Sequence, residues 1–201
     1  MAHNLTQADE YIPAELIELT HRLVTPEQFE ELCIKYTELR LELTSSGELI
    51  VMPPTGSETG KRNSNLTYQL EAWARRDGSG ICFAPSSGFT LPNNAIRSPD
   101  ASWIKHEKWG LLTNEEKKGF APLCPDFILE IRSPSDSLSQ LRDKMLEYIE
   151  NGASLGWLID PIKRRVYVYR PHQDPVILEN PETVSGDPLL PGFTLNVTEL
   201  W

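Results

Sequence analysis

PDFILEIRSPSD, residues 125–136, combines an apolar run with regularly spaced charges and ends in turn-forming residues. The apolar run predicts a β-strand over Phe127–Arg132, and the Ser-Pro-Ser-Asp that follows it is typical of a turn. Side chains alternate in direction along a strand, so Asp126, Glu130 and Arg132 share one face. The other face is wholly apolar, and the pattern therefore predicts a strand with a core face and a charged face.

The segments on either side of this strand predict a mixed α/β order. Helices are expected for about three turns after Thr25 and over Ser57–Arg76 and Ser137–Asn151. Hairpins are expected before Pro54 and over 164–178, and further strands at 81–84, 88–91, 97–104 and 155–159. This order favours an α/β domain with a central mixed sheet flanked by helices and an N-terminal β-hairpin. Residues 1–24 lack clear periodicity, and we expect them to form an N-terminal arm before a domain spanning 25–201.

Composition limits the classes of function. The 201 residues include 19 Lys and Arg against 29 Asp and Glu, which gives a net charge of −10. Such a charge disfavours coating of nucleic acid, so a nucleic-acid substrate would need a local basic surface or a metal. The three cysteines are widely spaced without a CxxC pair and predict neither a disulfide framework nor a zinc site. The sequence shows no signal peptide or membrane-spanning run, and we expect a cytoplasmic protein with no membrane partner.

A second Pro-Asp pair, Pro99-Asp100, opens the apolar segment 101–104. If this segment and the strand Phe127–Arg132 are neighbours, Asp100 and Glu130 can converge at one edge of the sheet. Converging carboxylates repel each other unless a proton or a cation lies between them. Magnesium prefers oxygen ligands and is often held by only one or two carboxylates. The pair therefore predicts a site for Mg²⁺, with Mn²⁺ as the alternative ion.

Hydrolysis of a phosphodiester at such a site also requires a cation to meet the developing negative charge. Arg132 shares the face of Glu130, and Lys144 flanks the apolar stripe of the following helix, from where it can reach the sheet edge. The residues alone leave the choice open. Each also has a simpler interpretation, because Arg132 could form a surface ion pair and Lys144 could lie on a solvated helix face. Asp126 is more simply explained as the start of the strand, bonded to backbone amides.

These residues resemble the PD-(D/E)XK motif of restriction-endonuclease-like nucleases, although Arg132 stands where that motif has lysine. A finer resemblance is to a large family described as "putative restriction endonucleases" and long catalogued as a domain of unknown function. It lies in ELIVMPPTGSETGKRN, RSPDASWI, PDFILEIRSPSD, DKMLEYIENGASLGWLIDP and LLPGFTL. These segments run in the family's order through residues 25–200, and together they are specific even though each alone is weak.

The resemblance implies a restriction-endonuclease-like fold in which Asp100 and Glu130 bind the metal and Lys144 replaces the missing motif lysine. Glu58 matches a position near the start of the long helix where related nucleases sometimes carry a further acid. Thr59 stands where the family often has histidine, which implies reduced activity if that histidine contributes to catalysis.

The function implied by the resemblance is that of a Mg²⁺-dependent endonuclease that hydrolyses phosphodiester bonds in DNA. The alternative is a catalytically inactive module that keeps the nuclease fold for binding or assembly. The net charge of −10 and the arginine at position 132 favour this alternative. A homodimer would suit cleavage of both DNA strands, but the sequence leaves the oligomeric state open.

Overall fold

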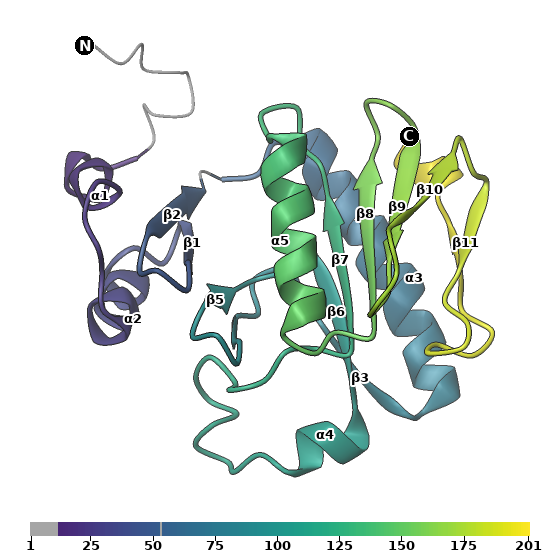
Figure 1. Ribbon diagram of the computed structural model, residues 1–201, viewed down its shortest axis with the longest axis horizontal. Coiled ribbons are helices and arrows are strands. Elements are labelled where there is room, and N and C mark those ends of the chain that lie inside the picture. Colours follow the sequence, from purple (N-terminus) through teal and green to yellow (C-terminus); the bar gives the residue numbers. More distant parts are fainter. Residues whose placement is uncertain (1–11, 53) are drawn as a thin grey trace.

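The computed structural model describes residues 12–52 and 54–201, and a six-stranded sheet forms its centre (Figure 1). The strand order is β10-β9-β8-β7-β6-β3. The strands are β3 (Gly80–Phe83), β6 (Ala101–Lys105), β7 (Phe127–Ile131), β8 (Leu155–Asp160), β9 (Arg165–Tyr169) and β10 (Val176–Glu179). Only β7 and β8 are parallel and the other neighbours are antiparallel, so the predicted mixed sheet is confirmed.

Helices cover both faces of this sheet. Helix α3 (Ser57–Asp77) shares one hydrophobic cluster with Leu129 and Ile131 of β7. Helix α5 (Leu138–Glu150) shares the opposite cluster with Ile128. All residues of β7 are buried, so the expectation of one core face and one charged face is wrong for this strand. The charged residue of β7 lies instead inside the protein.

A smaller sheet of order β2-β1-β5-β4 lies beside the central sheet (Figure 1). Its strands are β1 (Arg40–Leu43), β2 (Leu49–Met52), β4 (Phe89–Thr90) and β5 (Ile96–Arg97). We call this sheet, with α1 (Ala14–Leu19) and α2 (Pro26–Lys35), the N-terminal lobe. The predicted hairpin is confirmed as the antiparallel pair β1-β2. The predicted helix after Thr25 is confirmed as α2, which begins with a capping box between Thr25 and Gln28.

The lobe has its own core, which includes Leu16, Phe29 and Leu43. Residues 1–11 of the predicted N-terminal arm lie outside the described residues. The rest of the arm carries α1, and Leu16 of this helix is fully buried in the core of the lobe. This part of the arm therefore packs against the domain.

The strand predicted over 97–104 is in fact two strands in different sheets. Strand β5 belongs to the small sheet and β6 to the central sheet, and residues 98–100 connect them. Pro99 has no backbone N–H to donate to a ladder, which explains why the strand is interrupted here. The interruption leaves Asp100 at the junction between the two sheets.

The C-terminal segment fixes the position of α3. Strands β11 (Thr183–Ser185) and β12 (Thr194–Asn196) and the 3-10 turn η2 (Thr198–Leu200) contribute Val184, Leu195 and Leu200 to the cluster on the α3 face. The Arg62 side chain donates a hydrogen bond from Nε to the carbonyl of Leu200 at 2.7 Å. A short helix, α4 (His106–Gly110), follows β6 directly. Within the described ranges, no helix is long and apolar enough to cross a membrane.

Candidate active site

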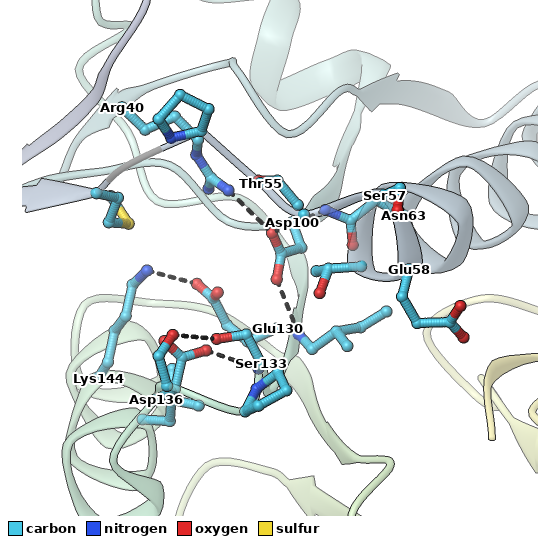
Figure 2. A pocket seen from close by; sticks show the side chains of 18 residues that line it. Arg40, Thr55, Ser57, Glu58, Asn63, Asp100, Glu130, Ser133, Asp136 and Lys144 are labelled. Carbon is cyan, nitrogen blue, oxygen red and sulfur yellow. Dashed lines mark hydrogen bonds and ion pairs between the residues drawn. The ribbon is translucent and has the colours of Figure 1, made fainter. Parts of the chain in front are cut away.

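A cavity of about 460 Å³ lies where the N-terminal lobe meets the central sheet. Its walls come from β1, the end of β2, the first two turns of α3, the junction at Asp100, the end of β7 with the turn after it, and α5. Figure 2 shows Asp100, Glu130 and Lys144 directed toward one another in this cavity. The structure therefore brings together the two carboxylates and one of the two cations that the sequence indicated.

Asp100 is held in place by three donors. The backbone N–H of Ile131 donates to Oδ2 at 2.9 Å, and Arg40 Nη1 donates to Oδ1 at 3.1 Å. The side-chain amide of Asn63 donates to the same Oδ1 at 3.4 Å. The antiparallel register of β6 and β7, which pairs Ala101 with Leu129, places Asp100 beside the end of β7. The carboxylate is thus oriented before any ligand arrives.

Glu130 is 4% exposed, and its Oε1 contacts two side chains of α5. Lys144 Nζ lies 2.7 Å from this atom, and the Tyr148 hydroxyl donates to it at 3.2 Å. Burial raises the pKa of Glu130 to about 7, and the negative charges of Asp100 and Glu42 act in the same direction against the attraction of Lys144. The site therefore disfavours the ionised form of Glu130 in the absence of a further cation.

Lys144 lies between two carboxylates. Its Nζ is 2.8 Å from Oε1 of Glu42 on β1, in addition to its contact with Glu130, and its side chain is 12% exposed. Burial lowers the pKa of a lysine, but Glu130 and Glu42 more than compensate, and the net effect raises the pKa of Lys144. The residue is therefore a buried cation with two counter-ions.

Glu42 is the most buried charged residue of this network. It is 1% exposed, and it accepts hydrogen bonds from the Ser98 backbone N–H at 2.9 Å and from Arg97 Nη1 at 3.2 Å. Burial raises the pKa of Glu42, but the positive charges of Lys144 and Arg97 lower it by more. The net effect is a lowered pKa. The ionised form of Glu42 is thus favoured, and this residue joins β1 to the site.

Sequence reasoning did not identify five residues of this network: Arg40, Glu42, Asn63, Arg97 and Tyr148. Two of them, Arg40 and Glu42, alternate with leucines along β1, a pattern that is typical of a strand with one face in solvent. Here the polar face of β1 is turned toward the cavity and the network. The only signal in the sequence was the presence of both charge signs on one short strand, which is too common to indicate a site.

The other predicted residues lie outside the centre of the site. Arg132 does not line the cavity, because its Nη1 pairs with the fully buried Asp160 at 3.0 Å. Glu58 lines the cavity from the first turn of α3, but its side chain is 65% exposed and pairs with Arg62. Asp126 accepts a hydrogen bond from the Lys105 backbone N–H at 2.9 Å, in agreement with the backbone-bonding role expected for it.

The donors at the cavity are suited to a magnesium ion. In the part of the chain that the structure describes, no group of three or more His, Cys, Asp or Glu side chains is placed to hold a metal. Asp100 and Glu130 nevertheless supply two carboxylates at one cavity. Within the described residues, the contacts of Glu130 with Lys144 and with the Tyr148 hydroxyl are both made by its Oε1. Magnesium keeps several waters and needs only one or two carboxylates, so the residues fit this ion.

Comparisons with known proteins identify similar proteins and a similar fold. Residues 26–198 match the model of the Uma2 family, described as "Putative restriction endonuclease". No curated protein matches the sequence. Among solved structures, the chain is similar to a crystal structure described as "a putative nuclease belonging to DUF820" from Anabaena variabilis ATCC 29413. The identity is 24% and the TM-score 0.67, over 80% of this chain and 88% of that chain. The predicted restriction-endonuclease-like α/β fold is confirmed.

Proposed function

The chain belongs to the Uma2 family of "putative restriction endonucleases", and from this membership we propose that it is a divalent-metal-dependent endonuclease that cleaves DNA. The observation that carries the proposal is the convergence of Asp100, Glu130 and Lys144 on one cavity. Two carboxylates and a buried cation are the groups that metal-assisted phosphodiester hydrolysis requires. The reaction would add water to a phosphorus atom and break one P–O bond of the DNA backbone.

Asp100 and Glu130 would hold the ion, which we propose to be Mg²⁺ or Mn²⁺. When bound, the ion would polarise the phosphate and lower the pKa of a bound water. The three donors to Asp100 would keep its carboxylate fixed, so that little reorganisation accompanies binding of the ion and the substrate.

Lys144 is the better candidate for the cation that meets the negative charge of the transition state. Its ammonium group lies in the cavity, whereas the guanidinium of Arg132 is paired with Asp160 away from it. Glu42 would keep Lys144 protonated and in position when Glu130 turns to the ion, because Lys144 then still has one counter-ion at 2.8 Å. Lys144 would donate a hydrogen bond to a phosphate oxygen as charge develops there.

The test is cleavage of plasmid and oligonucleotide DNA by the full chain with Mg²⁺ or Mn²⁺. We expect the wild type to cleave and Glu130→Ala to be inactive, while Glu150→Ala, an exposed glutamate on α5, retains full activity as the matched control. Equal cleavage by the wild type and Glu130→Ala would refute the assignment of the site. No cleavage by the wild type with either ion would favour the alternative, a catalytically inactive module for binding or assembly.

A further inference from the structure

One buried oxygen atom in the cavity has no partner. Asn63 on α3 is 8% exposed, and its side-chain Oδ1 makes no hydrogen bond with any described residue. Among the buried side-chain atoms of residues 12–52 and 54–201 that have no partner, only this oxygen and Arg40 Nε belong to residues that line the cavity. Arg40 Nε can only donate, whereas Oδ1 can only accept. A buried acceptor left unsatisfied in a folded protein indicates a water or an ion that it binds.

The orientation of the Asn63 amide follows from its neighbour. Its Nδ2 donates to Oδ1 of Asp100 at 3.4 Å. An ionised carboxylate can only accept hydrogen bonds, so the NH₂ group must face Asp100 and the oxygen must lie on the other side of the amide. The side chain therefore contacts one of the carboxylates proposed to hold the metal while leaving an oxygen lone pair free. Figure 2 shows Asn63 beside Asp100 in the cavity.

The position of Asn63 on its helix is also informative. It lies on the buried stripe of α3, three residues before Leu66 and seven before Leu70, both of which are buried in the core. An apolar residue is expected on such a stripe. The preceding residue, Arg62, is anchored to the Leu200 carbonyl at 2.7 Å, so this turn of α3 is fixed against the C-terminal segment. A polar side chain at a rigid core position points to a role at the cavity.

We propose that Asn63 is a third protein ligand of the divalent ion, bound through Oδ1; this inference rests on the proposed function. A side-chain amide oxygen is a hard, neutral ligand of the kind that Mg²⁺ and Ca²⁺ accept. Its neutrality suits this site, because Glu42, Asp100 and Glu130 already place three carboxylates near Lys144 and Arg40. Asparagine thus adds an oxygen ligand without adding repulsion to the metal-free protein.

The experiment measures metal binding by calorimetric titration of Mg²⁺ and Mn²⁺ into the full chain. We expect Asn63→Leu, which has a similar volume but no ligand oxygen, to weaken binding roughly tenfold or more. Asn63→Asp should bind at least as tightly as the wild type and show a larger rise in melting temperature on addition of metal. Asn65→Leu is the matched control on the same helix, because Asn65 contacts Glu199 and Gln69 away from the cavity, and its affinity should be unchanged.

A measurement on the wild type needs no substitution. The side-chain NH₂ signals of Asn63 in a ¹⁵N–¹H NMR spectrum should shift on addition of Mg²⁺, and those of Asn65 should stay in place. Unchanged Asn63 signals at saturating Mg²⁺ would overturn the inference.

The outcomes separate this inference from the proposed function. If Asn63→Asp binds metal as weakly as Asn63→Leu, Asn63 acts only as a donor to Asp100 and is not a ligand. If Asn63→Leu binds as tightly as the wild type, the inference also fails, and cleavage by the wild type would still support the proposed function. If the wild type binds neither Mg²⁺ nor Mn²⁺, the proposed function and this inference fail together.

Discussion

Lys144 and Arg132 are both cations close to Glu130 in the sequence, but they differ in what surrounds them. Lys144 Nζ contacts Glu42 and Glu130 at the cavity, whereas Arg132 contacts Asp160 and the carbonyl of Asp136. The first arrangement places a cation where a substrate phosphate would come. The second arrangement forms an ion pair between Arg132 and the buried Asp160 at the ends of β7 and β8, so Arg132 has a structural role.

Substitution of the two cations should separate these roles. We expect Lys144→Met to lower the rate of DNA cleavage roughly 100-fold or more, as the loss of a group that stabilises transition-state charge does. Arg132→Met should instead lower the free energy of unfolding by about 3 kcal/mol, because the buried Asp160 loses its counter-ion and keeps only the backbone donors of Ile162 and Lys163. Its cleavage rate per folded molecule should stay at the wild-type level. The measurements are single-turnover cleavage and urea unfolding, and the reverse pattern would assign catalysis to Arg132.

The raised pKa of Glu130 predicts that ionisation of this residue lowers the free energy of unfolding of the metal-free protein. Because its folded-state pKa is about 7 and that of an ordinary glutamate is near 4.5, the folded protein holds this proton more tightly. The stability that this proton provides is fully present below pH 4.5 and is lost as the pH rises to 7. In the presence of a chelator, Glu130→Gln should therefore gain stability relative to the wild type between pH 4.5 and 8, by up to about 3 kcal/mol. Urea unfolding at both pH values measures this, and a constant difference would contradict the shift.

At the scale of elements, the charge network connects the N-terminal lobe to α5. Glu42 on β1 contacts Lys144 on α5, and Arg97 on β5 contacts both Glu42 and Glu147. These ion pairs are buried, so each partner depends on the other for compensation of its charge. The network therefore fixes the position of the lobe relative to the helix that carries the catalytic candidate.

Removal of Glu42 should weaken this connection. We expect Glu42→Gln to lower the free energy of unfolding by roughly 3 to 5 kcal/mol, because Lys144 and Arg97 both lose a buried counter-ion. The matched control is Glu48→Gln, since Glu48 is exposed on the same hairpin and its loss should cost no more than about 0.5 kcal/mol. Chemical denaturation measures both changes, and equal values for the two variants would show that the buried network adds nothing to stability.

Elements with a strong local pattern could be predicted from the sequence. The capping box at Thr25, the alternating hairpin and the apolar stripe of α5 each specify their structure within a few neighbouring residues. The burial of both faces of β7 could not be predicted, because it depends on which segments pack against the strand. The break at Pro99 has a local cause, but the division of its two sides between different sheets depends on tertiary pairing. The same limit applied to the site: Asp100 and Glu130 follow a motif, whereas Glu42 and Asn63 acquire their place only through tertiary packing.

At the scale of the whole molecule, the cavity is shared between the N-terminal lobe and the central sheet with its helices. The N-terminal lobe lines it with Arg40 and Met52, and the central sheet with its helices lines it with Glu130 and Lys144. The lobe has its own core, and only Phe89 among the described residues of its strands packs into the cluster on the α5 face. A ligand that contacts both sides of the cavity would therefore bind only when the two units are correctly packed together.

Metal binding should accordingly stabilise both units. At a hundredfold excess of free Mg²⁺ over its dissociation constant, we expect the free energy of unfolding to rise by about 2.7 kcal/mol. Hydrogen exchange should slow in β1 as well as in β7, because Arg40 and Asp100 are coupled across the junction at 3.1 Å. Hydrogen–deuterium exchange with mass spectrometry locates the effect. Protection restricted to the central sheet would indicate that the lobe takes no part in the site.

The junction at residues 98–100 also bears on how this protein is made and inherited. The chain leaves the N-terminal lobe after β2, builds α3 and β3, and returns to add β4 and β5 before it crosses to β6. The lobe is thus assembled from two separate stretches of the gene, and on the ribosome its sheet can be completed only after α3 has been synthesised. No single continuous stretch of the gene encodes this lobe without α3 and β3, so the lobe and the central sheet are expected to evolve as one unit.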